Sequence, residues 1–362
     1  MENRGRRMAE NKKTSKNVAG GKKKHKALKI ILIIFIILVV IIAAICAAGY
    51  TYIYSMLDKT NEEQINESNI NIDETVKDEL SDYRNIAIFG LDSRKDDYGR
   101  GNRSDCIIIA SINKKTSEVK LVSVYRDTYL KITGRNLDKV THAYSYGGAE
   151  LALSTLNSNL DLNIKEFVTV NFDAVVDAVD ALGGIKMKIT SEEVKYINSY
   201  IDENNKVTGH NSSHINTAGT YNLDGVQALA YSRIRYTSGG DYKRTERMRD
   251  VLEAMLNKAK SLSVTELINV ANIMLPKIST NISSSDIIGL APTLISMKIS
   301  ESEGWPKETK GSNIGGVYYG VPVTLEQMVT KLHEELFNQQ NYIPSQTVKG
   351  ISNEIIKKTG IK

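Results

Sequence analysis

The sequence predicts an α/β protein: a three-layer α-β-α sandwich with a mainly buried mixed sheet, preceded by one N-terminal transmembrane helix. Two observations carry this prediction. Between residues 85 and 189, apolar runs of strand length alternate with segments of helical periodicity, which is typical of a sheet covered by helices on both faces. Before them, residues 30–57 hold no charged side chain, and an apolar run of that length can cross a bilayer as one helix.

The predicted elements follow one another with turn residues between them. Short apolar runs predict strands, and apolar positions three or four apart predict helices. Strands are expected at residues 85–89, 106–112, 119–124, 167–171, 185–189 and 315–319. Helices are expected at residues 150–160, 172–182, 241–260, 264–275, 285–297 and 325–337. The polar, Asn-rich residues 191–219 predict a loop at the rim of the domain.

Charge and hydropathy divide the rest of the chain. Residues 1–29 are basic and predict a cytoplasmic tail before a single membrane span at residues 30–54, because basic residues stay on the inner side. A cleavable signal peptide is the alternative reading of this span. After it we expect an extracellular spacer at residues 55–83, a folded domain at 84–337 and a polar tail at 338–362.

The composition of the extracellular part excludes some classes of protein. Eleven of the 47 Lys+Arg and two of the 42 Asp+Glu lie in residues 1–29, which leaves 36 basic and 40 acidic residues beyond them. A slightly acidic body is not that of a nucleic-acid-binding protein. Cys106 is the one cysteine outside the predicted span, so the folded domain has no internal disulfide and depends on its hydrophobic core.

Arginine and lysine are distributed differently along this body. The 25 lysines beyond residue 29 are scattered, whereas the 11 arginines lie either between residues 84 and 135 or between residues 233 and 249. Lysine suffices for solubility, but the planar guanidinium group binds phosphate or carboxylate in bidentate geometry. The arginines therefore indicate an anion-binding site. The alternative is a surface network of ion pairs with nearby carboxylates.

One segment, residues 230–250 (AYSRIRYTSGGDYKRTERMRD), holds five of these arginines. Gly239 and Gly240 interrupt regular structure, and Asp241 is predicted to cap a helix that runs to residue 260. Arg244 and Arg247 then lie near the start of that helix, where cations are disfavoured unless an anion binds beside them. The expected anion is a phosphate.

Aspartates follow or begin the predicted strands. Asp92 in GLDSR follows the first strand and Asp105 in RSDCIIIA begins the second, while Arg126 and Asp127 in SVYRDTYL follow the third. Strand ends are where α/β sheets usually bind ligands. Asp92 and Asp105 could hold Mg²⁺, or Mn²⁺ in its place, because hard cations prefer carboxylate oxygens and neutralise phosphate charge. A turn-forming role for Asp92 and a local Arg126–Asp127 ion pair are the alternatives.

Several motifs occur together and in a fixed order. They are GLDSR, RSDCII, VSVYRD, DKVTHAYSYGG, VDALGG, LDGVQALAYSRIR and DYKRTER, spread over residues 85–260 behind a single predicted membrane anchor. An ordered set of this kind is far more specific than any one member. In this set the chain resembles the LytR-CpsA-Psr family of cell-wall glycopolymer transferases.

The resemblance implies a magnesium-dependent phosphotransferase anchored in the cell membrane, with its catalytic domain outside. Its donor would be a glycopolymer on a polyprenyl diphosphate, such as teichoic acid or capsular polysaccharide, and its acceptor peptidoglycan. Asp92 and Asp105 are implied as metal ligands, and the implied catalytic residues are Arg126, Asp241 and Arg244. The implied substrate-binding residues are Arg103, Arg126, Arg233, Arg235, Arg244 and Arg247.

Two positions depart from the family pattern, since Tyr125 replaces a usual Pro and Met248 a usual Gln. Met248 keeps open a non-catalytic protein that binds lipid-linked polymer or has a regulatory role. A polyprenyl-diphosphate pyrophosphatase, with water as the acceptor, is the other alternative. Asp127 or Asp241 could take the acceptor's proton, whereas His142 is interpreted as a framework residue. Phe167, Val175, Val179 and Leu182 either line a slot for the polyprenyl chain or pack in the core.

Overall fold

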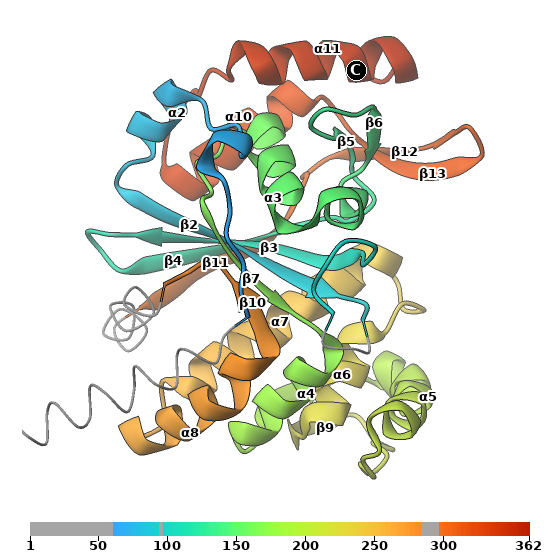
Figure 1. The fold of residues 1–362 in the computed structure, drawn as a ribbon. Helices are drawn as coiled ribbons and strands as arrows, with labels where there is room; N and C mark the ends of the chain where they lie inside the picture. Colours follow the sequence, from blue (N-terminus) through green and yellow to red (C-terminus); the bar gives the residue numbers. More distant parts are fainter. Residues whose placement is uncertain (1–60, 94–96, 284–296) are drawn as a thin grey trace, which may run out of the picture. The chain divides into compact units, whose positions relative to one another are not determined.

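The computed structural model describes residues 61–93, 97–283 and 297–362 (Figure 1). At its centre is a seven-stranded sheet, whose strands in spatial order are β1 (Asn61–Glu62), β10 (Ile278–Thr280), β7 (Glu166–Val170), β2 (Tyr83–Leu91), β3 (Ser104–Asn113), β4 (Glu118–Val124) and β11 (Lys298–Trp305). The pairs β2–β3, β3–β4 and β7–β10 are antiparallel, and β1–β10, β2–β7 and β4–β11 are parallel. The predicted α/β fold with a mixed central sheet is confirmed.

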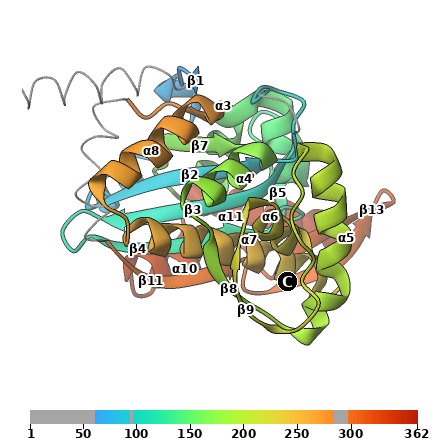
Figure 2. The same cartoon turned by 90° about the horizontal axis from the view of Figure 1, so that it is seen from below.

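Helices cover both faces of this sheet (Figures 1 and 2). One face carries α2 (Glu74–Glu79), α3 (Thr141–Leu160), α10 (Leu325–Phe337) and α11 (Gln346–Thr359). The other face carries α4 (Phe172–Ala181), α6 (Gly225–Arg233), α7 (Gly240–Ala259) and α8 (Val264–Met274). The sheet is therefore the middle of three layers.

The apolar runs of the central strands pack on both faces of the sheet, because alternate residues of a strand point to opposite faces. In β2, Ala87, Phe89 and Leu91 enter the large core under α3 and α10. Ile86 and Ile88, on the other face of β2, line an internal cavity beneath α4 and α7. Both faces are covered, which explains why the run is apolar at successive positions.

The remaining elements lie around these layers. Three two-stranded antiparallel sheets are formed by β5 (Tyr129–Lys131) with β6 (Leu137–Lys139), β8 (Ile185–Ile189) with β9 (Gly219–Leu223), and β12 (Thr309–Ile314) with β13 (Val317–Pro322). The other elements are the 3-10 turns η1 (Glu67–Asn69) and η2 (Leu275–Lys277) and the helix α5 (Ser191–Thr208). The strand expected at residues 185–189 therefore belongs to a peripheral two-stranded sheet and not to the central sheet.

Helix α5 contradicts the loop that we expected at residues 191–219. It begins with a capping box, in which Thr190 and Glu193 satisfy each other's backbone N–H groups, and it ends at Gly209 with a left-handed backbone. Its buried positions include Ile197 and Ile201, one turn apart on an otherwise polar helix. The capping pair was visible in the sequence, but the narrow apolar stripe among asparagines hid the helix.

Both ends of the expected domain are also corrected. Residues 338–362 are not a polar tail, because α11 packs into the large core through Val348, Ile351 and Ile355. Residues 61–83 are not a free spacer, because Ile70 and Leu80 are fully buried in the same core. The folded domain extends from β1 to the last residues of the chain.

Two predicted elements lie outside the described residues, the membrane span at 30–54 and the helix at 285–297 except for its last residue. Within residues 61–93, 97–283 and 297–362, none of the helices combines the length and the apolar character needed to cross a bilayer.

Candidate functional site

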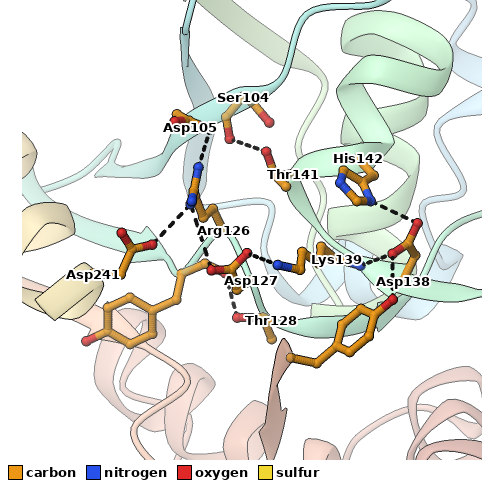
Figure 3. A network of polar contacts seen from close by, with 12 residues as sticks. Ser104, Asp105, Arg126, Asp127, Thr128, Asp138, Lys139, Thr141, His142 and Asp241 are labelled. Carbon is orange, nitrogen blue, oxygen red and sulfur yellow. Dashed lines mark hydrogen bonds and ion pairs between the residues drawn. The ribbon is translucent and has the colours of Figure 1, made fainter. Parts of the chain in front are cut away.

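Three arginines converge on two aspartates at one end of the central strands. Figure 3 shows one of them, Arg126, between Asp105 and Asp241. Arg126 follows β4, and its Nη1 lies 2.8 Å from Asp105 Oδ1 while its Nε lies 3.0 Å from Asp241 Oδ2. Arg244, on the first turns of α7, places Nη1 3.6 Å from Asp105 Oδ2 and Nε 3.4 Å from Asp241 Oδ1. Arg235 approaches the same two carboxylates at 3.7 and 3.9 Å. We call Arg126, Arg235, Arg244, Asp105 and Asp241 the arginine cluster.

The local structure explains how Asp241 joins the cluster. Helix α7 begins at Gly240, and its N-cap is Gly239, whose φ of 93° suits glycine. Asp241 therefore lies in the first turn and is not the cap that we predicted. Its side chain is free to contact guanidinium groups. It is 37% exposed, whereas Asp105 is only 7% exposed.

The neighbouring carboxylates stabilise the protonated form of Arg126. Burial acts to lower the pKa of Arg126, but the nearby Asp105 and Asp241 carboxylates outweigh it and hold the pKa above its ordinary value. For Arg244, which is 2% exposed, burial is the largest effect and lowers the pKa. Arginine still stays protonated at neutral pH. The cluster thus sums three positive and two negative charges and favours an anion.

Arg244 also has unused hydrogen-bonding capacity. A guanidinium carries five N–H donors, and among the described residues the one hydrogen bond of Arg244 is a 3.4 Å contact from Nη2 to Asp241. Its buried Nε has no hydrogen-bond partner in the described part of the chain. Buried donors in native proteins are usually satisfied. A phosphate group bound at the cluster would accept from guanidinium groups that the protein leaves underused.

The other predicted substrate arginines have different partners. Arg247 is 1% exposed and pairs with Glu193, with Nε 2.9 Å from Oε1, and it also donates to Ile234 O and Thr237 Oγ1. These contacts hold the segment between α6 and α7. Arg233 donates to Glu203 and Asn204 of α5. Their side chains therefore stabilise the wall around the cluster instead of joining it.

Arg103 and Asp92 lie beside the same strand ends. The Arg103 side chain is exposed, and its carbonyl accepts hydrogen bonds from the backbone N–H groups of Asp92 and Asp105 at 3.4 and 3.1 Å. The Asp92 carboxylate is exposed, in contrast to the buried Asp105. Arg94 of the same motif lies outside the described residues.

The donor set near Asp92 fits one kind of metal site. Within the described ranges, no group of three or more His, Cys, Asp or Glu side chains is arranged to hold a metal ion. Mg²⁺ commonly binds one or two carboxylates and takes its other ligands from waters and substrate phosphates. Asp92 at the strand end and Asp105 within the arginine cluster fit an ion of this kind, which would take its remaining ligands from water and from a bound phosphate.

A second polar network extends from the cluster toward α3 (Figure 3). Lys139 Nζ lies 2.8 Å from Asp127 Oδ1, and Asp138 accepts from His142 Nδ1 at 2.9 Å and from Tyr146 at 2.7 Å. Burial acts to raise the pKa of Asp138, but these hydrogen bonds hold it below its ordinary value. The contacts agree with the framework role expected for His142. Nothing in the sequence predicted the pairing of Lys139 with Asp127.

An apolar cavity of about 420 Å³ lies between the sheet and α4, α6, α7 and α8. Along β3 its lining runs from Asp105 to Ile112, which corresponds to about 23 Å at the usual rise of a strand. Asp105 is thus shared between the cavity and the arginine cluster. Val175 lines the cavity as one expected slot residue, whereas Phe167, Val179 and Leu182 pack in the hydrophobic cores. Met248 also lines the cavity, so its thioether faces an apolar space.

Cys106 gives a chemical probe of this cavity. Burial raises the pKa of its thiol to about 12, so at pH 8 the reactive thiolate is scarcer by about three orders of magnitude than for an ordinary cysteine. In a Cys46→Ser background, we expect iodoacetamide to leave Cys106 unmodified for hours in the folded protein and to modify it within minutes in urea. Mass spectrometry checks this, and rapid alkylation of the folded protein would show that the cavity is wet.

The fold and the site together define an α/β protein with a partly buried arginine cluster at one end of an apolar cavity. The sequence model of the LytR_cpsA_psr family matches residues 48–335. A relative from Enterococcus faecalis, polyisoprenyl-teichoic acid–peptidoglycan teichoic acid transferase TagU, is 32% identical over 81% of this chain and 90% of its own. The chain belongs to the LytR-CpsA-Psr family.

Solved structures agree with this assignment. The structure of TagT bound to LIIa-WTA is 28% identical, with a TM-score of 0.55 over 83% of this chain and 97% of its own. A second structure, a LytR-CPS2A-psr family protein YwtF (TagT) with bound octaprenyl pyrophosphate lipid, is 27% identical, with a TM-score of 0.51 over 81% and 95%. Similar folds have thus been solved with bound LIIa-WTA and with bound octaprenyl pyrophosphate lipid.

Proposed function

We propose that this protein transfers a glycopolymer, a teichoic acid as in its named relatives, from a polyprenyl diphosphate to peptidoglycan. The observation that carries the proposal is the position of Asp105, which lines the apolar cavity and contacts all three guanidinium groups of the arginine cluster. A ligand with an apolar tail and an anionic diphosphate head could place its tail in the cavity and its head at the arginine cluster, because Asp105 borders both. The TagU relative and the lipid-bound TagT structure support the same ligand class.

The chemistry follows from the charges of the cluster. An acceptor hydroxyl attacks the phosphorus that carries the polymer, a new P–O bond forms, and the bond to the lipid phosphate breaks, so that polyprenyl monophosphate leaves with the electron pair. Arg126, Arg235 and Arg244 stabilise the negative charge that grows on the phosphoryl oxygens. The hydroxyl proton passes to Asp241, the most exposed carboxylate that contacts Arg126.

Magnesium is part of this proposal. Asp92 and Asp105 would hold Mg²⁺, or Mn²⁺, together with the diphosphate, and the ion would neutralise phosphate charge. Replacing Asp92 with Asn keeps the side-chain shape but removes the charge. We expect the Mg²⁺ concentration for half-maximal transfer to rise at least about tenfold, because a carboxylate ligand is lost. A Mg²⁺ titration of transfer checks this, with Asp97→Asn as the control, and an unchanged titration curve would contradict a metal role for Asp92.

The predicted span at residues 30–54 would keep the catalytic domain at the outer face of the membrane, where a lipid-linked donor also resides. Tethering enzyme and donor to one surface raises their effective concentration.

A reconstituted reaction tests the proposed function. The full-length protein in detergent is given polyprenyl-diphosphate-linked teichoic acid with labelled polymer, purified peptidoglycan and Mg²⁺. We expect label to appear in peptidoglycan and polyprenyl monophosphate to be released in equal amount. Release of monophosphate without label in peptidoglycan would indicate a pyrophosphatase. Donor binding without either product would indicate a binding protein.

A further inference from the structure

A second pocket adjoins the arginine cluster, on the side where Asp241 lies. It has a volume of about 310 Å³ and is lined by Tyr125, Arg126, Asp127, Asp241, Tyr242 and Tyr318, among others. We call it the tyrosine pocket. We propose that it binds an N-acetylated hexose of the peptidoglycan acceptor and brings the sugar hydroxyl to the phosphorus. This inference rests on the proposed transfer function.

The first argument is the position of the pocket relative to the cavity. The two spaces share no lining residue, and Arg126 links them, since it contacts Asp105 of the cavity and Asp241 of the pocket (Figure 3). In phosphoryl transfer, the attacking and leaving oxygens lie roughly in line. If the lipid phosphate leaves toward the cavity, the acceptor hydroxyl must approach from the other side of the cluster. The tyrosine pocket lies there.

The second argument is the aromatic lining of the pocket. The rings of Tyr125 and Tyr242 are perpendicular, with centroids 4.4 Å apart, and Tyr242 shares a hydrogen bond with Thr309. Tyr318 is 50% exposed, and its ring lies over Gly311 of the neighbouring strand, where a Cβ would be 2.9 Å from it. Tyrosine combines an apolar face with a polar tip, and a sugar ring presents the same two kinds of surface. The side chains are also held in place before a ligand binds.

The third argument concerns charge and separates the acceptor from the donor polymer. Arg126 is the one Lys or Arg of the pocket lining, against Asp127 and Asp241. Arg126 is itself paired with Asp105 and Asp241, and Asp127 with Lys139, so the lining offers repeated phosphates little free positive charge. Its tyrosine and threonine hydroxyls suit uncharged hydroxyl and acetamido groups. A wider hollow of about 530 Å³ continues from Tyr125, Tyr242 and Thr309 toward Pro306 and Val323, which provides room for further sugars of a glycan strand.

Two substitutions test the pocket without touching the cluster. Tyr318→Ala removes one aromatic face. Gly320→Ala adds a methyl group whose nearest contacts, 3.7 Å to Tyr242 Oη and 3.8 Å to Asp127 O, are ordinary, so it narrows the pocket at little cost to the fold. Val317→Ala is the matched control, because Val317 is 42% exposed on the same strand and does not line the pocket.

The measurement is transfer by the full-length protein to soluble peptidoglycan oligosaccharides, with acceptor and donor varied separately. We expect Tyr318→Ala and Gly320→Ala to raise the KM for the acceptor by about three- to tenfold, as for the loss of one aromatic contact, and to change the donor KM by less than about twofold. The control should match the wild type in both. A raised donor KM with an unchanged acceptor KM would assign the pocket to the donor sugar and overturn the inference, as would no change in either.

A binding experiment separates failure of this inference from failure of the proposed function. If the wild-type protein shows no transfer, titration calorimetry with the same oligosaccharides still reports on the pocket. Binding that Tyr318→Ala weakens by about three- to tenfold supports an acceptor-sugar site. Equal binding by the variant and the wild type, or none by the wild type, contradicts it.

Discussion

Replacing Arg126 with Ala should lower kcat for polymer transfer by about 10³-fold, with a fold that stays intact. Removal of one preorganised donor to transition-state charge costs about 10²–10³ in other enzymes, and Arg126 also connects Asp105 with Asp241. The fold should survive because Arg235 and Arg244 still lie within 4 Å of both carboxylates. Single-turnover transfer and a thermal melt of the same preparation measure the two effects.

Two controls sharpen this expectation. Arg126→Lys keeps the positive charge, but lysine lacks the planar guanidinium group that contacts Asp105 and Asp241 at the same time. Its transfer rate should therefore lie between those of the wild type and the Ala variant. Arg135→Ala removes an exposed arginine that stacks on Tyr146 and lies outside the cluster, and its rate should equal that of the wild type. An Arg126→Ala protein that keeps more than about a tenth of the wild-type kcat would exclude the role given to this residue.

Replacing Arg247 with Met should destabilise the domain by about 3–5 kcal/mol, because it leaves the buried carboxylate of Glu193 without its cation. For a domain of this size, the thermal midpoint should fall by roughly 10 °C. Differential scanning calorimetry measures the change. The expected loss is one of stability, although the family resemblance implied that Arg247 binds substrate.

The double variant Arg247→Met/Glu193→Gln distinguishes these two roles. Gln can replace Glu in the capping box with Thr190, and the pair of charges disappears together, so most of the stability should return. At 25 °C the double variant should also transfer polymer at about the wild-type rate. A double variant that is stable but inactive would show that Arg247 also holds the substrate.

The sequence predicted four of the seven strands of the central sheet, β2, β3, β4 and β7, because their signal is local, and it missed β1, β10 and β11. Runs such as residues 106–110 are apolar at every position, and the structure shows why: Ile107 and Ile109 enter the core while Ile108 and Ala110 line the cavity. The missed helices α5 and α11 have a narrower apolar stripe. In α11 the buried residues Val348, Ile351 and Ile355 have helical spacing but stand among polar neighbours, and that stripe becomes informative only when its packing partners are known.

The sequence predicted which types of residue form the site, but not which individual side chains meet there. The concentration of arginines in two segments predicted that these segments meet, and Arg126, Arg235 and Arg244 do meet. The sequence could not separate Arg244 from Arg247, which lie three residues apart on α7, because the difference comes from Glu193 on another helix. The tyrosine pocket was also out of reach, since Tyr125, Tyr242 and Tyr318 come from three distant segments.

The pairing of β1 with β10 shortens the connection that we expected between the folded domain and the membrane anchor. We expected a spacer of residues 55–83, yet β1 is already fixed to the sheet edge at Asn61. If the predicted membrane span ends at residue 54, six residues connect it to β1, and six residues of fully extended chain measure at most about 20 Å. A connection this short would keep the catalytic domain close to its membrane anchor. Each molecule would therefore act only on lipid-linked donors that diffuse to that anchor, and polymer would be attached to peptidoglycan near the anchors.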